Sequence, residues 1–174
     1  MRNKNSIKMY NLVFPIWLLW LFPLTWIVVL PANFIIDSLV VLITLKLLKV
    51  SNIKNLYKKA ILKVWGFGFL SDFIGTAIMF IPMLIEGKIP IAYREWWYKN
   101  LNSAVSYDPF KSGYAVAWIV MAIIITSFFI YLFNYKVSFK KLDIEEKSKK
   151  KLALSLAIFT APYLFLLPTM WFVS

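Results

Sequence analysis

The chain has 174 residues, 61% of them hydrophobic, with a mean hydropathy of +0.71. A soluble domain of this length does not need so much apolar surface, so the composition excludes an ordinary soluble protein. The formal net charge is +12, but the lysines flank long apolar runs. The charge therefore indicates membrane topology rather than nucleic-acid binding, and we expect a protein of the lipid bilayer.

Membrane-spanning helices need about 20 consecutive apolar residues. Five segments approach this length, and they are the predicted spans: 10–30, 32–48, 60–85, 113–135 and 152–173. The first is too long for the apolar region of a cleaved signal peptide, so we interpret it as a retained span. The predicted fold is one all-α transmembrane domain, residues 1–174, in which about five helices form a compact bundle.

Prolines shape this predicted bundle in two ways. Only Pro31 separates the first two spans, and "LPAN" predicts a tight hairpin there, because proline fits the first turn of a helix. The alternative is one long bent element that enters and leaves on the same side. Further prolines lie inside the predicted spans, where each is expected to kink its helix: Pro15, Pro23, Pro82, Pro162 and Pro168.

Lysine and arginine alternate between the two sides of the predicted bundle. The N-terminus carries three, the second connection six and the inner loop at 136–151 seven, whereas the first connection carries none and the outer loop at 86–112 four. The positive-inside rule therefore predicts a multi-pass plasma-membrane protein. Its N-terminus is expected in the cytoplasm and its C-terminus outside.

Both long loops carry candidate membrane contacts. The outer loop has apolar residues near helical spacing, which predicts a short interfacial helix anchored by Tyr93, Trp96, Trp97 and Tyr98. That helix is either an aromatic anchor or a lid or docking surface. The inner loop is expected to hold anionic lipid headgroups through its lysines, Lys140, Lys141, Lys149, Lys150 and Lys151.

Two of the eight acidic residues, Asp37 and Asp72, lie inside predicted spans. An aspartate at the centre of a span costs about 2.5–3.5 kcal/mol on insertion scales, so it needs partners or a function. Asp37 precedes Lys46 by nine residues and Asp72 follows Lys63 by nine, roughly 13.5 Å of helix in each case. Both carboxylates are thus expected at a similar depth on neighbouring spans, facing each other.

Small and polar residues accompany both aspartates at helical spacing. Asn33 lies one turn before Asp37, and Ser71 and Thr76 lie next to Asp72 and one turn after it. Two carboxylates that close together in hydrocarbon are expected to share a proton. The group Asp37, Asp72, Asn33, Ser71 and Thr76 is therefore a candidate proton or hard-cation site, and the alternative is a polar clasp that fixes helix register.

Cysteine and histidine are both absent, which removes thiol and imidazole chemistry and the usual ligands of zinc and haem. We predict no metal site and no cofactor. The composition, rich in Lys, Ile, Asn and Phe, resembles that of proteins encoded by AT-rich bacterial genomes. No motif resembles a known family: Gly66 and Gly68 precede Asp72 at the wrong spacing for the Gly-x-Gly-Asp signature of intramembrane aspartyl proteases.

Three classes of function remain. The first is a non-enzymatic accessory component that binds a protein partner or a second copy of itself. The second is a small proton- or cation-coupled transporter, or a subunit of one, that uses Asp37 and Asp72. The third is an intramembrane enzyme, which would have only these carboxylates as acid–base groups. The sequence places the accessory component slightly ahead of the transporter.

Overall fold

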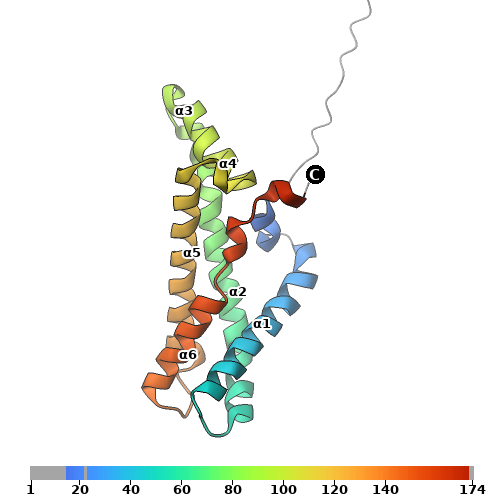
Figure 1. Cartoon of the computed structure of the whole chain (residues 1–174), viewed down its shortest axis with the longest axis vertical. Helices are drawn as coiled ribbons and strands as arrows, with labels where there is room; N and C mark the ends of the chain where they lie inside the picture. The colour runs from blue at the N-terminus through green and yellow to red at the C-terminus, as the bar shows by residue number, and fades with distance from the viewer. Residues whose placement is uncertain (1–14, 22, 173–174) are drawn as a thin grey trace, which may run out of the picture.

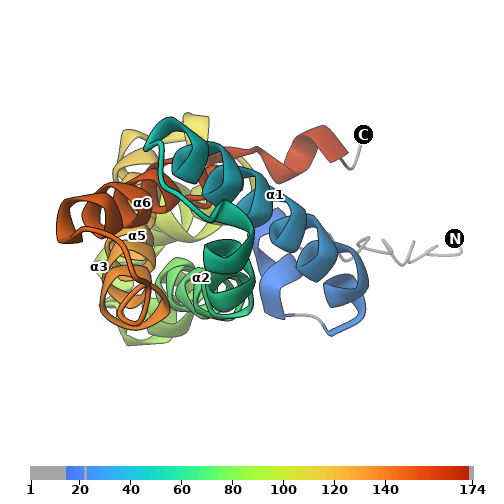
Figure 2. The same cartoon turned by 90° about the horizontal axis from the view of Figure 1, so that it is seen from below.

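The structure is a computed structural model that describes residues 15–21 and 23–172. Within these ranges the chain is helical and contains no strand. The α-helices are α1 (Trp26–Leu47), α2 (Ile53–Ile85), α3 (Ile91–Trp97), α4 (Ser103–Tyr107), α5 (Gly113–Phe133) and α6 (Glu146–Phe159). Helix α2 packs against α1 and α5, and α6 packs against α5 and α1, so these four helices form a ring (Figure 2).

Short 3-10 and π segments join or extend the α-helices. The 3-10 turns are Ile16–Leu21, Pro23–Thr25, Glu86–Lys88, Pro109–Lys111, Tyr163–Leu166 and Thr169–Phe172, and the π turns are Tyr98–Asn102 and Asn134–Ser138. Helices α3 and α4 close one end of the bundle, and the turn after α1 and the loop before α6 close the other (Figure 1).

In the described part of the chain, three helical segments are long and apolar enough to cross a membrane: Pro23–Leu47, Ile53–Lys88 and Gly113–Ser138. Their outer faces are apolar, with Ile27 on α1, Leu62 on α2 and Ile124 on α5 all more than 60% exposed. A hydrophobic exterior of this kind is what lipid requires and water disfavours. The structure supports a helical membrane protein, but not the five spanning helices predicted from the sequence.

The predicted hairpin at Pro31 is wrong. Pro31 lies inside α1, which continues without a break from Trp26 to Leu47. Pro31 is the sixth residue of α1, so its missing N–H frees the carbonyl of Ile27, a loss that membrane helices tolerate. The indole of Trp65 on α2 also donates to the carbonyl of Leu30, next to the proline. The earlier residues form 3-10 turns at 16–21 and 23–25 instead of the predicted first span at 10–30, whose start lies outside the described residues.

The fifth predicted span, 152–173, is not one helix either. Helix α6 ends at Phe159, and the chain continues through two short 3-10 turns to Phe172. Pro162 and Pro168 explain the change, because each lacks an N–H for a helical bond and its ring crowds the preceding turn. The two prolines therefore end helical segments and do not kink one. The segment still runs from the α6 end of the bundle to α4, where Thr169 Oγ1 donates to the carbonyl of Ser106 (Figure 1).

Of the prolines predicted to kink a span, only Pro82 lies within an α-helix of the described residues. Its missing N–H leaves the carbonyl of Ile78, four residues earlier, without its helical partner. The indole of Trp118 on α5 donates to this carbonyl at 3.2 Å. A neighbouring helix therefore satisfies the group that the proline frees, which hydrocarbon requires of every backbone polar group.

Basic residues gather at one end of the bundle. The turn between α1 and α2 and the loop between α5 and α6 lie together there (Figure 1). The lysines of the second connection and of the inner loop lie on these two segments and on the adjoining ends of α1, α2 and α6. The four basic residues of the outer loop lie at the opposite end, around α3 and α4. Among the described residues, these three regions show the segregation of charge that the sequence predicts.

Two apolar clusters fill the bundle and leave a gap between them along α1 and α2. One cluster, at the α4 end, includes Trp17, Met79 and Phe165. The other, at the basic end, includes Val41 and Val64. On both helices the aspartates lie between the residues of the two clusters, and this gap holds the candidate site.

Candidate functional site

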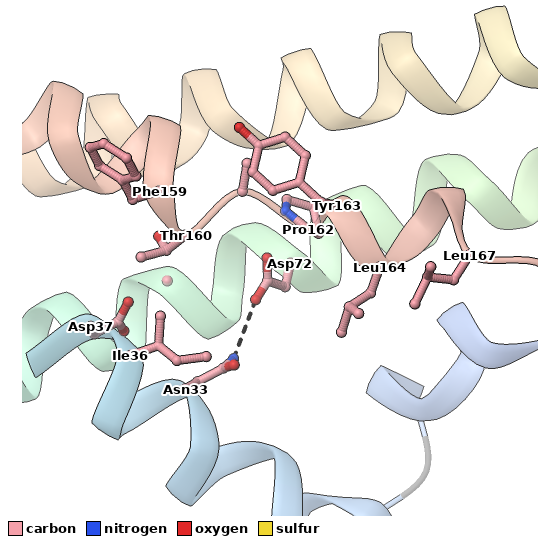
Figure 3. A pocket seen from close by; sticks show the side chains of 12 residues that line it. Asn33, Ile36, Asp37, Asp72, Phe159, Thr160, Pro162, Tyr163, Leu164 and Leu167 are labelled. Atoms are coloured by element: carbon pink, nitrogen blue, oxygen red, sulfur yellow. Dashed lines mark hydrogen bonds between the residues drawn. The ribbon is translucent and has the colours of Figure 1, made fainter. Parts of the chain in front are cut away.

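Asp37 on α1 and Asp72 on α2 lie near the middle of their helices and line the same cavity. Both aspartates are buried, with only 5% of each residue exposed. The cavity has a volume of about 350 Å³, and Figure 3 shows residues of α1, α2 and the segment after α6 around it. The structure thus brings together the two intramembrane carboxylates that the sequence placed at similar depth.

One-turn spacing on each helix positions these groups. Asn33 and Asp37 lie on one face of α1, and Gly68 and Asp72 lie on the opposing face of α2. Asn33 Nδ2 donates to Asp72 Oδ2 at 3.4 Å (Figure 3). Gly68 makes room for Asp37, because a Cβ at this glycine would lie 3.3 Å from Asp37 Oδ2. The two helices therefore approach closely at the level of the carboxylates.

The second carboxylate oxygen of Asp72 is unpaired. Oδ1 is buried and has no hydrogen-bond partner among the described residues. A buried polar atom without a partner is costly, and in native structures it points to strain, catalysis or an absent water or ion. A clasp that only fixed helix register would be expected to satisfy both oxygens.

Ser71 and Thr76 do not join this group. Both are fully buried but neither lines the cavity. Ser71 Oγ donates to the carbonyl of Phe67 at 2.8 Å, and Thr76 Oγ1 donates to the backbone carbonyl of Asp72 at 2.9 Å. Serine and threonine commonly make this bond one turn back within helices, which satisfies the hydroxyl locally. The polar part of the cavity therefore consists of Asp37, Asp72 and Asn33 together with a threonine that is not among the predicted site residues.

That residue is Thr160, in the non-helical segment that follows α6 and forms the third wall of the cavity. Its hydroxyl also donates one turn back, to the carbonyl of Leu156 at 2.9 Å, so Thr160 lines the cavity without a free donor. Pro162 ends α6, and its missing N–H frees the carbonyl of Ile158. The hydroxyl of Tyr163 donates to this carbonyl at 2.7 Å. Irregular backbone at membrane depth is tolerated where it is buried in protein or lines a cavity. Pro162 was the sequence signal for this wall, but we interpreted it as a kink.

The rest of the lining is apolar and comes from α1 and from both sides of Pro162, namely Ile36, Phe159, Ala161, Leu164 and Leu167. The last residues of α6 also belong to it, so the negative end of the α6 dipole lies at the cavity. Two carboxylates and a helix C-terminus favour a positive charge. Chemically, the cavity can hold a proton or a cation beside an apolar body.

The aromatic residues predicted as interface anchors lie on α3 and the π turn that follows it. Tyr93, Trp96 and Tyr98 are exposed, at 66%, 44% and 51%. Trp97 points toward the bundle and donates from Nε1 to the carbonyl of Pro82 at 3.0 Å. The predicted short helix of the outer loop is therefore present. It is tied to α2 through Trp97 and contacts α5 through Trp96, whose ring centroid lies 5.0 Å from that of Tyr114.

The predicted lipid-contacting lysines lie at the basic end of the bundle. Lys140 and Lys149 line a shallow pocket of about 300 Å³ with Tyr135, Lys136 and Glu146. A hydrogen bond from the Tyr135 hydroxyl, helped by the charge of Lys149, lowers the pKa of Glu146. Glu146 is therefore ionised at neutral pH and neutralises part of this basic surface.

The remaining predicted lysines lie beside that pocket. The ammonium of Lys150 lies over the ring of Tyr135, 5.9 Å from its centroid. Lys151 lies one residue further along α6 and lines an apolar groove, and Lys141 is exposed in the loop before α6.

Comparison with known proteins adds no assignment. The chain matches no protein-family model, no curated protein sequence and no solved structure. The function therefore has to be argued from the site itself.

Proposed function

We propose that this chain is a small multi-pass membrane protein that binds a proton or a monovalent cation between Asp37 and Asp72, as a transporter or a transporter subunit. The observation that carries the proposal is the unpaired Oδ1 of Asp72, on a residue that is 5% exposed and lines a cavity. A bound cation would supply the missing partner and would offset the cost of a carboxylate in the membrane. The cavity thus favours the second of the three classes over the first.

Alternating access fits the same geometry. Many transporters bind their ion near the bilayer midplane, where a discontinuous helix exposes backbone beside the site. Here the break at Thr160–Pro162 lies opposite the two aspartates. The carboxylates can take up a cation when one side is open and exchange it for a proton when the other is open. No other group in the described lining carries a charge, so both steps fall to the aspartates.

The orientation in the membrane follows from the charges. The positive-inside rule places the end that carries the turn after α1 and the loop before α6 in the cytoplasm. Helices α3 and α4 and residues 169–172 then lie outside, as the sequence predicted for the C-terminus. Trp17 also lies at this outer end, where its Nε1 donates to the carbonyl of Val105 at 3.1 Å, so this assignment does not favour the predicted cytoplasmic N-terminus. Arg2, Lys4 and Lys8 themselves lie outside the described residues. The lysines of the cytoplasmic end would hold anionic headgroups of the plasma membrane.

A partner-binding accessory protein is the second candidate. The exposed rings of Tyr93, Trp96 and Tyr98 on one short surface favour it, since such rings are enriched where proteins or membrane interfaces are contacted. This candidate does not explain the unpaired oxygen of Asp72. It predicts that replacing the three rings abolishes function while Asp72→Asn leaves it intact.

The direct experiment uses the full chain reconstituted in liposomes adsorbed to a solid-supported membrane. Rapid jumps in pH, in Na⁺ or in tetramethylammonium are applied, and charge displacement is recorded. At least one jump is expected to displace charge in the wild type and in Asp143→Asn, an exposed loop carboxylate. Asp72→Asn should abolish the signal. The proposal would be overturned if correctly inserted wild-type protein displaced no charge after any of the jumps. An unchanged signal in Asp72→Asn would also overturn it.

A further inference from the structure

A second hollow runs along the lipid-facing surface between α1 and α6. It has a volume of about 660 Å³ and extends over α1 from Ile36 to Leu48 and over α6 from Lys151 to Phe159. Its walls are almost entirely aliphatic, and several wall residues are exposed, with Ile43 at 56% and Leu154 at 51%. The groove is therefore open to whatever surrounds the bundle, which in a bilayer is hydrocarbon.

The groove and the carboxylate cavity adjoin each other. Ile36 on α1 and Phe159 at the end of α6 line both of them. An extended molecule can thus lie with one end beside Asp37 and Asp72 and the remainder between α1 and α6. From Ile36 to Leu47 the groove follows roughly 16 Å of helix, which accommodates an alkyl chain.

We propose that the ligand is an amphipathic organic cation that enters laterally from the bilayer. Its ammonium group would lie between Asp37 and Asp72, and its apolar chain in the α1–α6 groove. This inference rests on the proposed cation site and specifies the chemical class of its ligand. The charges are complementary at the cavity, where Asp72 has a buried oxygen without a partner.

The lining selects against the other ligand classes. A small inorganic ion gains nothing from Ile36, Phe159 or the aliphatic groove beyond them. An uncharged lipid chain would fill the groove but leave Asp72 Oδ1 unpaired. Lys151 lines the far end of the groove, so a second positive charge on the chain would be repelled there. The site therefore fits a monocation with one apolar tail.

The test measures binding of tritiated dodecyltrimethylammonium to the full chain in nanodiscs of zwitterionic lipid, with empty nanodiscs as background. Binding is expected to be saturable and to weaken about tenfold or more in Asp72→Asn. Ile43→Trp or Leu154→Trp, each of which fills the groove, should weaken it by a similar factor. The matched control is Ile124→Trp on the exposed face of α5, which should leave the affinity unchanged.

If a tryptophan variant fails to fold, a series of cations with increasing chain length, measured on the wild type, still tests the proposal. Affinity should rise from tetramethylammonium through the octyl to the dodecyl compound. Equal affinities across the series, with no effect of groove variants, would overturn the amphipathic ligand but leave the cation site standing. If Asp72→Asn left the affinity for the dodecyl compound unchanged, the amphipathic-cation proposal would also be overturned, and the groove would be assigned to lipid chains. Absence of binding by every cation, Na⁺ and protons included, would overturn the inference together with the proposed function.

Discussion

Asn33 on α1 donates its side-chain amide to Oδ2 of Asp72 on α2, and this is the one hydrogen bond described for that carboxyl group. The bond joins two helices at the level of the cavity. Oδ1 of the same carboxyl group is buried and has no hydrogen-bond partner among the described residues.

Removing that amide should weaken both the fold and the site. Interhelical hydrogen bonds in membranes contribute about 0.6 kcal/mol on average, so Asn33→Ala is expected to lower stability by about that amount. Thermal unfolding in mild detergent measures the change. Asn55→Ala, an exposed amide on α2, is the matched control and should be neutral or slightly stabilising. A loss in Asn33→Ala no larger than in the control would show that the bond contributes nothing.

Gly75 is the close-contact point of α2 with α5 and the segment after α6. A Cβ there would clash with Thr126 Oγ1 and would lie 2.9 Å from Phe165 Cε2. Overpacking of this kind costs about 1–3 kcal/mol, so Gly75→Ala should lower the unfolding temperature clearly. Gly66→Ala on the same helix meets nothing within 4 Å and should be neutral or stabilising. Thr126→Ala should recover part of the loss in the Gly75→Ala background; equal effects of the two glycine variants would contradict the packing described here.

Trp118 and Pro82 form a testable pair because the tryptophan satisfies the carbonyl that the proline frees. Trp118→Phe should destabilise the wild type, whereas Pro82→Ala restores the helical N–H to Ile78. In the Pro82→Ala background the cost of Trp118→Phe is therefore expected to fall by about 1 kcal/mol. A double-mutant cycle on thermal or denaturant unfolding measures this coupling. If Trp118→Phe lowered the free energy of unfolding equally in both backgrounds, the indole would not be the hydrogen-bond donor to this carbonyl.

Orientation is open to labelling because the chain has no cysteine. Lys88→Cys and Lys111→Cys lie at the α3–α4 end, and Lys54→Cys and Lys141→Cys at the opposite end. In intact cells a membrane-impermeant maleimide should label the first pair and reach the second only after lysis. The reverse pattern would invert the assigned topology.

Periodicity and charge predicted a large part of this structure. The faces of α1 and α2 that carry Asp37 and Asp72 follow from one-turn spacing, and the helical membrane class follows from hydropathy and length. The two misassigned segments both involve proline. A proline near a helix start is compatible with an unbroken helix at Pro31, whereas Pro162 ends α6, and hydropathy alone does not separate these outcomes.

The site was predictable only in its polar half. Ser71 and Thr76 share the face of Asp72, but their hydroxyls bond to backbone carbonyls one turn back, a competition that sequence spacing does not reveal. Thr160 and the apolar wall around it come from a segment far away in the chain. Its approach to α1 and α2 depends on tertiary packing, which the spacing of residues along a single helix does not reveal.

The most direct measurement asks whether the cavity is hydrated and holds a cation. Thr160→Cys lines the cavity, and Thr76→Cys is a buried control outside it. Both are treated with a membrane-impermeant maleimide in nanodiscs, where both membrane faces are accessible. We predict that Thr160→Cys reacts and that dodecyltrimethylammonium slows it, except when Asp72→Asn is also present, while Thr76→Cys does not react. A Thr160→Cys protein that stays unlabelled when folded, but labels after unfolding in detergent, would contradict a cation-binding cavity.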